Sequence, residues 1–324
     1  MLILNNGDLA KCVSYDEMLK AVEKAYTIYE DGSFFMPDRT HVDYRQKNIL
    51  YMPCFLDHVF GTKVLTIFPE NAKKGVPTLD GLMLLNDYET GKTVAMMDGI
   101  TITALRTGAV GGTAIRYMTP ETVQSVGLIG AGVQGYYQVV YACMVRGFRK
   151  IFLYDAFRKD YTDFIMRLRK EISPDVEIVV SDTAEALLRE SEVIINATPA
   201  TAPTMPNDAE LLKGKHFVGI GSYKPNMREY PDALFSLLEN VYIDTDIALE
   251  ESGDLIQPIE AGLLKTDQLR RFGRLMKSPE EIMSISRKTT LFKSVGMSIF
   301  DVVAADLLYH KALEYNLGYS VGSN

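Results

Sequence analysis

Short apolar runs alternate with helix-like segments from about residue 119 to residue 297. This rhythm is typical of parallel strand–helix–strand units, because strands buried on both faces read as continuous apolar runs. A helix is expected over Val133–Val145, with Gly147 just beyond it where a helix end favours glycine. The middle of the chain therefore predicts a doubly wound α/β domain with six parallel strands, at Ser125–Ile129, Lys150–Tyr154, Val176–Val180, Val193–Ala197, Phe217–Gly221 and Val241–Ile243.

The first 118 residues show a different pattern. After a helix expected over Tyr15–Tyr29, strand-like pieces follow at 49–53, 61–68 and 79–86. Turn-forming residues at 89–91 predict a hairpin after the last piece. This part of the chain therefore predicts an antiparallel or mixed sheet.

Two further helices flank the middle domain. Ile100–Tyr117 has a small-residue face with Gly108, Gly111 and Gly112, which allows another element to approach closely. Ser298–Tyr315 has apolar residues at helical spacing and is expected to return to the first part of the chain. We therefore expect a substrate and dimerisation domain over 1–118, a nucleotide-binding domain over 119–297, and a helix in 298–324 that completes the first domain.

Composition narrows the class of function. A length of 324 residues predicts two domains, and a formal net charge of -8 argues against a broad electrostatic grip on nucleic acid or anionic membranes. The first residues turn polar too soon for a signal peptide and no apolar run is long enough to span a bilayer, so we expect a cytoplasmic protein. No metal site is expected, because the cysteines and histidines are dispersed, at Cys12, Cys54, Cys143, His41, His58, His216 and His310.

A glycine-rich loop follows the strand at Ser125–Ile129. Gly130, Gly132 and Gly135 form the pattern G-x-G-x-x-G, and the next strand ends in Asp155. The glycines permit a tight turn, the approach of a pyrophosphate and close helix packing, while the acid accepts hydrogen bonds from the adenosine ribose. The loop predicts NAD in preference to NADP. Arg158 leaves NADP open, because it could reach a 2′-phosphate.

Three cations interrupt apolar or small-residue segments in the first part of the chain. They are Arg39, Lys63 and Arg106. A buried charge needs a partner, and an anionic substrate is one such partner, since arginine suits a carboxylate and a desolvated lysine exchanges protons near neutral pH. A structural salt bridge or a solvated face is the alternative for each of them.

Several motifs occur in a specific order along nearly the whole chain. They are FMPDR ending at Arg39, YMP at Tyr51–Pro53, GTKVLTIFPEN at Gly61–Asn71, TALRTGAVGGTA at Thr103–Ala114, VGLIGAGVQG ending at Gly135, NATPAT at Asn196–Thr201, GIGSYKPNMREYP at Gly219–Pro231 and the segment Lys293–Gly318. With these motifs the chain resembles the ornithine cyclodeaminase and mu-crystallin family. The resemblance implies a Rossmann domain inserted into a second mixed α/β domain that carries the substrate pocket and a homodimer interface.

The resemblance also implies roles for single residues. Arg39, Lys63 and Arg106 are expected to bind the substrate carboxylate, with Lys63 also serving in proton transfer. The residues expected to contact the cofactor are Thr78, Arg106, Gly130, Gly132, Val133, Gln134, Gly135, Asp155, Thr198, Gly219, Gly221 and Val295. Family members pass a hydride between a nicotinamide and a carbon that bears nitrogen next to a carboxylate.

One position departs from the cyclodeaminase pattern. Tyr223 stands where the resemblance implies an aspartate that handles the amine in cyclodeaminases. Tyrosine is a second candidate catalytic residue because it can donate a hydrogen bond or proton, but a pKa near ~10 makes it a poor base at neutral pH. We therefore expect an NAD(P)-dependent amino-acid dehydrogenase or a ketimine or cyclic imine reductase. The alternatives are a cyclodeaminase-type lyase that uses NAD catalytically and a crystallin-like protein that binds nucleotide without turnover.

Overall fold

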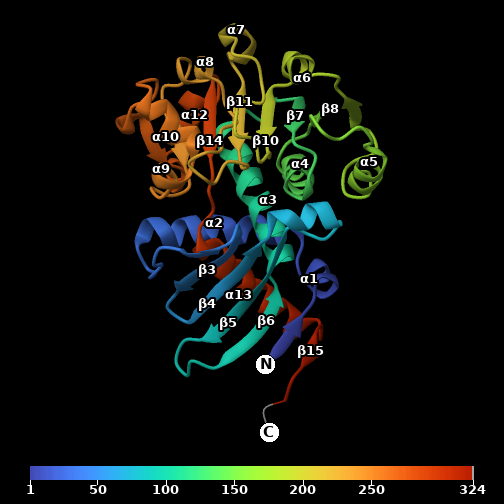
Figure 1. Ribbon diagram of the computed structural model, residues 1–324, viewed down its shortest axis with the longest axis vertical. Helices are drawn as coiled ribbons and strands as arrows, with labels where there is room; N and C mark the ends of the chain where they lie inside the picture. The colour runs from blue at the N-terminus through green and yellow to red at the C-terminus, as the bar shows by residue number, and fades with distance from the viewer. Residues whose placement is uncertain (323–324) are drawn as a thin grey trace. The chain divides into compact units, whose positions relative to one another are not determined.

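The computed structural model describes residues 1–322 and divides into two compact units (Figure 1). Unit 1 comprises Met1–Arg106 and Met297–Asn324, and unit 2 comprises Thr107–Gly296. Helix α3, Gly99–Met118, belongs to both units, since they divide within it between Arg106 and Thr107. The sequence pattern suggested a division after this helix, because its apolar spacing continues without interruption.

Unit 2 contains a parallel sheet of eight strands in the order β13-β12-β14-β11-β10-β7-β8-β9. Figure 1 labels five of them, β14, β11, β10, β7 and β8, in this order. All seven strand pairs are parallel, and the strand order reverses between β7 and β10, as in a doubly wound fold. The strands are β7 Ser125–Ile129, β8 Lys150–Tyr154, β9 Glu177–Val180, β10 Val193–Asn196, β11 His216–Gly219, β12 Val241–Ile243, β13 Leu269–Arg271 and β14 Thr290–Lys293.

The six predicted strands are all present, but the predicted number was too small. Strand β14 lies near the centre of the sheet between β11 and β12, and each of its residues is buried. Its four residues, TLFK, are too few to stand out as an apolar run, and its conformation is fixed by pairing with strands that are distant in sequence. Strand β13, LRR, carries no apolar pattern at all.

Helices cover this sheet and close its core. The helix α4, Val133–Val145, has the predicted bounds and packs Gln138 and Tyr141 against the small-residue face of α3. Gln138 donates from Nε2 to the Thr107 carbonyl over 2.7 Å, which fixes the contact. The other helices are α5 Thr162–Leu168, α6 Ala184–Glu190, α7 Ala209–Leu212, α8 Asp232–Phe235, α9 Ala248–Glu251, α10 Gly253–Glu260, the 3-10 helix Thr266–Gln268, α11 Phe272–Leu275 and α12 Pro279–Ile285.

Unit 1 contains a mixed sheet of seven strands in the order β15-β1-β6-β5-β4-β3-β2. Strand β1 pairs with β6 in parallel, and every other pair is antiparallel, including the predicted hairpin of β5 and β6. The strands are β1 Leu2–Leu4, β2 Thr40–Tyr44, β3 Lys47–Phe55, β4 Val59–Ile67, β5 Leu79–Asp87, β6 Thr93–Asp98 and β15 Tyr319–Ser320.

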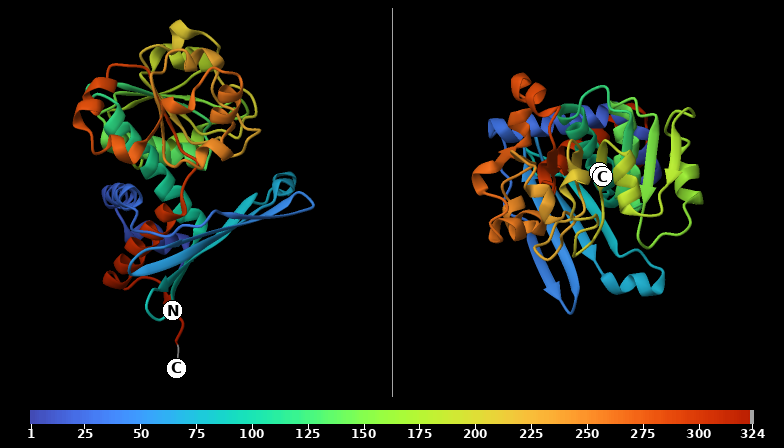
Figure 2. Two further views of the ribbon diagram at one scale, coloured as in Figure 1. Left: turned by 90° about the vertical axis from the view of Figure 1, so that its left-hand side faces the viewer. Right: turned by 90° about the horizontal axis from the view of Figure 1, so that it is seen from above.

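Two long helices of unit 1 lie on the same side of its sheet (Figure 2, left). Helix α13, Ser298–Glu314, packs on β3, β4 and β5, and α2, Tyr15–Asp31, packs on α13. Ser14 caps α2 by accepting the Glu17 N–H, while Gly32 ends it in a left-handed conformation. The remaining helices are α1 Asn6–Cys12 and the 3-10 helix η1 Pro69–Lys74.

The opposite face of the same sheet is open. Along β3 and β4, buried and partly exposed positions alternate, as expected for strands covered on one side. Tyr51, Val64 and Leu82 lie opposite one another on β3, β4 and β5 and form an apolar row. Tyr51 and Leu82 are 39% and 46% exposed, so this row is available for contact. In the described part of the chain, no helix has the length and apolar character needed to span a membrane.

Candidate functional site

Lys63 occupies a dry position in the middle of unit 1. It lies on the covered face of β4, opposite Met52 on β3 and Met83 on β5. Both methionines are buried, and Lys63 itself has no exposed surface. A lysine buried in this way has lost its hydration shell, so its charge depends on the protein groups around it.

The partner of Lys63 is Asp301, which comes from the first turn of α13. Lys63 Nζ lies 2.7 Å from Asp301 Oδ2, and Arg106 Nε lies 3.0 Å from Asp301 Oδ1. The Asp301 side chain is fully buried and bridges both cations. The prediction that these cations need a partner is met within the chain by a residue that the sequence analysis did not identify. Lys63 and Arg106 therefore form a structural salt bridge with Asp301, which was the alternative considered for these cations.

The electrostatic balance at Lys63 favours proton exchange near neutral pH. Burial, helped by the Arg106 and Arg39 charges, lowers the pKa of Lys63 from 10.5 to about 7, although Asp301 opposes this shift. For Asp301, burial acts to raise the pKa, but the Arg106 and Lys63 charges outweigh it and hold the pKa below its ordinary value. At neutral pH the cluster contains a fixed carboxylate and an amine poised to gain or lose a proton.

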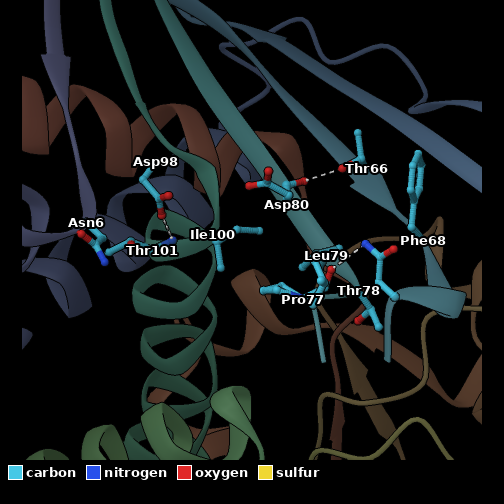
Figure 3. A pocket seen from close by; sticks show the side chains of 12 residues that line it. Asn6, Thr66, Phe68, Pro77, Thr78, Leu79, Asp80, Asp98, Ile100 and Thr101 are labelled. Atoms are coloured by element: carbon cyan, nitrogen blue, oxygen red, sulfur yellow. Dashed lines mark hydrogen bonds between the residues drawn. The ribbon is translucent and has the colours of Figure 1, made fainter. Parts of the chain in front are cut away.

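Arg39 and Thr78 lie at the edges of this region of unit 1. Arg39 directly precedes β2 and is half-buried, and its charge acts on Lys63. Thr78 directly precedes β5 and lines a pocket of about 550 Å³, together with the acids Asp80 and Asp98 (Figure 3). Asp98 accepts the Thr101 N–H and so fixes the first turn of α3, the helix that carries Arg106.

The glycine-rich loop of unit 2 has the geometry that a dinucleotide requires. Gly130 has φ +99°, a left-handed conformation that favours glycine, and a Cβ at Gly135 would lie 2.1 Å from the Gly130 carbonyl oxygen. At Gly132, by contrast, a Cβ would meet no atom within 4 Å. The loop is therefore tightly packed behind and open in front, where Val133 is exposed at the start of α4. Gln134, the next residue of α4, is partly exposed.

Asp155 joins this loop to the turn that follows β8. Its Oδ2 accepts the Ala131 N–H over 2.9 Å, and its Oδ1 accepts the N–H groups of Phe157 and Arg158. The Arg158 guanidinium lies 5.8 Å from the centre of the Phe164 ring, so in this conformation it contacts an aromatic ring. The carboxylate thus has a fixed position beside the glycine loop, as a ribose-binding acid requires.

The other predicted cofactor residues lie at the carboxyl ends of the parallel strands. Thr198 follows β10, Gly219 and Gly221 lie at and after the end of β11, and Val295 follows β14. Parallel sheets bind ligands at this edge. Val295 is held by Asp244, which also accepts hydrogen bonds from Ser294 Oγ and the Gly296 N–H.

Tyr223 lies in the loop after β11 and is 39% exposed. Burial raises the pKa of its hydroxyl further above the ordinary value of 10. The group is therefore protonated at neutral pH and can donate a hydrogen bond, but it is even less suited to act as a base than its sequence suggested. Sequence reasoning also missed Asp244 and Glu229, two buried carboxylates that bind backbone N–H groups in this region.

Comparison with known proteins places the chain in a defined context. The profile of the Ornithine cyclodeaminase/mu-crystallin family matches residues 2–316. Delta(1)-pyrroline-2-carboxylate reductase of Bacillus cereus is 28% identical over 326 residues, which cover 98% of each chain. The similarity extends through both units.

Two solved structures are similar over the same length. Thermococcus litoralis Delta(1)-pyrroline-2-carboxylate reductase, in complex with NADH and L-proline, superposes with a TM-score of 0.90 at 33% identity, covering 99% of this chain and 100% of that one. An archaeal alanine dehydrogenase dimer with bound NAD superposes with a TM-score of 0.87 at 28% identity, covering 99% of each chain. Both similarities include the strands that carry the residues described above.

Proposed function

The chain belongs to the ornithine cyclodeaminase/mu-crystallin family, and we propose that it is an NADH-dependent reductase of a small cyclic imino acid. The relatives that support this proposal are named as Delta(1)-pyrroline-2-carboxylate reductases, and one of them binds NADH and L-proline. The glycine loop and Asp155 support NAD(H) as the cofactor, since the loop is open in front of Gly132 and the acid would repel a 2′-phosphate.

The observation that carries the proposal is the buried cluster in which Asp301 holds the Lys63 amine beside Arg106, where burial lowers the pKa of Lys63 to about 7. Reduction of an imine adds a hydride to carbon and a proton to nitrogen, so the protein must supply an acid that is protonated at working pH and can release its proton. A lysine in water fails this requirement because its pKa is about 10.4. Lys63 meets it because burial and two arginines lower its pKa.

The charges around Lys63 support a substrate with one carboxylate. Asp301 is shared by Lys63 and Arg106, and the Arg39 charge also acts on Lys63. This concentration of cations would attract a substrate carboxylate, and an arginine guanidinium can bind it through two parallel hydrogen bonds. In the proposed complex the carboxylate is held by these arginines, which orients the neighbouring C=N group toward Lys63.

The reaction then requires few groups of the protein. Bound NADH would supply the hydride to the imine carbon. Lys63 donates a proton to the imine nitrogen, and Asp301 holds the Lys63 amine in place and stabilises its charged form before transfer. Tyr223 remains a candidate hydrogen-bond donor to the substrate. The same groups catalyse amino-acid oxidation in reverse, with neutral Lys63 accepting the proton.

The test is an activity screen of the purified full chain. Delta(1)-pyrroline-2-carboxylate and other cyclic imino acids are offered with NADH or NADPH, and linear amino acids, including alanine, with NAD or NADP. We expect the fastest turnover with a cyclic imino acid and NADH. Formation of proline and ammonia from ornithine, without net consumption of NADH, would instead identify a cyclodeaminase, and nucleotide binding without any turnover would identify a crystallin-like protein.

We further propose that the protein is a homodimer formed through the open face of the unit 1 sheet. The apolar row of Tyr51, Val64 and Leu82 supports this, because rows of exposed apolar side chains on a sheet are typical of protein interfaces. The similar archaeal alanine dehydrogenase is a dimer. Analytical ultracentrifugation of the Leu82→Glu variant tests the interface, and a monomer is the expected result.

An enzyme that draws on cellular NADH is expected in the cytoplasm.

A further inference from the structure

Glu229 joins two loops of unit 2 that lie at the carboxyl ends of neighbouring strands. Its Oε1 accepts the Thr198 N–H over 2.9 Å and the Thr198 hydroxyl over 2.8 Å. Its Oε2 accepts the N–H groups of Gly221 and Ser222 over 2.9 and 3.0 Å. One carboxylate thus binds the loop after β10 with one oxygen and the loop after β11 with the other.

The Glu229 contacts are isolated from water. Its side chain has no exposed surface, and Lys293 Nζ lies 3.7 Å from Oε2. Lys293 also forms an ion pair with the buried Asp254 over 3.0 Å, and Asp254 in turn accepts the Glu229 N–H over 2.6 Å. Both ends of residue 229 are therefore fixed, the side chain by the two loops and the backbone by Asp254. Such a buried network is rigid only while each donor keeps its acceptor.

The same carboxylate closes the loop that contains Tyr223. Residues 221 and 222 begin this loop and Glu229 ends it, so the hydrogen bonds to Oε2 join its two ends. Ser222 Oγ donates to the Met227 carbonyl over 3.0 Å inside the loop. The space is tight, because a Cβ at Gly221 would lie 2.1 Å from the Thr198 carbonyl oxygen. Displacement of either loop would therefore move the other.

We propose that Glu229 is the positioning residue for the nicotinamide half of the cofactor. It sets Thr198 and Gly221, two residues expected to contact the cofactor, and with them the loop of Tyr223. These residues follow β10 and β11, in the mononucleotide-binding half of the sheet that does not carry the glycine loop and Asp155. The inference rests on the proposed function, because it takes NADH as the ligand at this edge of the sheet. The adenosine half depends on different groups, the glycine loop and Asp155. Among the described residues neither of them hydrogen-bonds to Glu229, although Gly130 packs against the Thr198 side chain.

Glu229→Gln removes the acceptor from one loop while keeping the size of the side chain. The amide nitrogen must face either Thr198 or the pair Gly221 and Ser222, and backbone N–H groups cannot become acceptors. In the full-length variant we expect the dissociation constant for NADH to rise at least about tenfold, because a buried donor loses its partner. The dissociation constant for ADP-ribose, which lacks the nicotinamide, is expected to stay within about twofold. Both are measured by calorimetric titration.

Glu192→Gln is the matched control in the same sheet. Glu192 Oε2 also accepts backbone N–H groups, from Gln124 and Ser125 over 2.6 and 3.0 Å, but at the amino end of the strands, away from the expected cofactor edge. This variant should change neither dissociation constant beyond about twofold. If the loss of any such carboxylate loosened the sheet as a whole, both variants would bind both NADH and ADP-ribose more weakly.

The outcomes separate the inference from the proposed function. Equal weakening of NADH and ADP-ribose by Glu229→Gln, or no weakening of either, would overturn the positioning role. If that variant does not fold, Glu229→Asp keeps the charge but is too short to reach both loops, and the same selective loss of NADH affinity is expected from it. Failure of the unaltered protein to bind NADH would instead contradict the proposed cofactor.

Discussion

Lys63 on β4 and Asp301 on α13 form a fully buried ion pair with 2.7 Å between Nζ and Oδ2, although 238 residues separate them in the chain. The pair does not simply neutralise two charges. Arg106 shares the carboxylate, and Arg39 adds a further positive charge nearby, so Lys63 keeps a lowered pKa despite its partner. This combination of a fixed position and an exchangeable proton is what a general acid requires.

Loss of the Lys63 amine should abolish most of the activity while sparing the cofactor. Methionine should be tolerated at position 63, because Lys63 lies between two other methionines, Met52 and Met83. Turnover of the best imino acid should fall by at least about 100-fold, because the general acid is gone. The dissociation constant for NADH should not change. Lys73→Met, at an exposed lysine, is the control, and full activity in Lys63→Met would refute the assignment of the acid.

The pH dependence of turnover should report the Lys63 amine. For imine reduction the amine must be protonated, so turnover should be constant at low pH and fall as the pH rises through about 7. For amino-acid oxidation the amine must be neutral, and turnover should rise through the same range. Asp301 raises the pKa of Lys63, so Asp301→Asn should move this limb to lower pH. A limb that stays in place or moves to higher pH in this variant would contradict the pairing of Asp301 with Lys63.

Removal of Asp301 should also destabilise unit 1. Asp301→Ala leaves Lys63 and Arg106 buried without their carboxylate, which typically costs about 3–5 kcal/mol in the free energy of unfolding. Asp306→Ala on the same helix is the matched control. Asp306 pairs with His58 and His310, which are both exposed, so the expected loss is below about 1 kcal/mol. Urea denaturation followed by circular dichroism compares the two, and equal losses would argue against the charge cluster.

Asp155 should determine the choice between the two nicotinamide cofactors. Asp155→Ser removes the charge that would repel a 2′-phosphate, so the preference for NADH over NADPH should shrink by about tenfold or more. Asp160→Ser is the control, because Asp160 also accepts a backbone N–H, from Thr162, without contacting the glycine loop. Binding titrations with both cofactors decide the matter. Tighter binding of NADPH than of NADH by the unaltered protein would reverse the interpretation.

Tyr223 should contribute orientation and not acid–base chemistry. The pKa of its hydroxyl is raised by burial, so it keeps its proton throughout the neutral range. Tyr223→Phe should therefore reduce turnover by no more than about tenfold, the usual effect of one hydrogen bond. The limb near pH 7 should stay in place in its pH–rate profile. Its disappearance would transfer the role of proton donor from Lys63 to Tyr223.

The regular elements were predictable where their pattern was long and local. Helix α4 and strands β7, β8 and β12 have the predicted bounds, because apolar runs and turn residues define them without help from the rest of the chain. Strand β14 was not predictable from four residues, although it lies inside the sheet. Its conformation follows from pairing with β11 and β12, which is tertiary information.

The residues of the site were also predictable only where the local sequence pattern marked them. Lys63 and Arg106 were identified because a positive charge interrupts an apolar or small-residue pattern. Asp301 interrupts the apolar pattern of α13 in the same way, but one acid in a long helix is usually a solvated position. Its role depends on the packing of α13 on β4, which brings the two segments together. Glu229 was hidden for a similar reason, since its partners are backbone groups of loops whose geometry the sequence does not specify.

The position of α13 in the chain sets an order for folding during synthesis. All of unit 2 precedes α13, and its last strand, β14, is available once residue 293 has left the ribosome. Unit 1 begins with residue 1, yet its sheet lacks its covering helix until Glu314 has been made. Because domains fold as units when their sequence is complete, the middle of the chain is expected to fold first. Until α13 has been made, the apolar face of β4 that carries Lys63 stays exposed on the nascent chain. This face is therefore open to aggregation for longer than it would be if unit 1 were one continuous segment of the sequence.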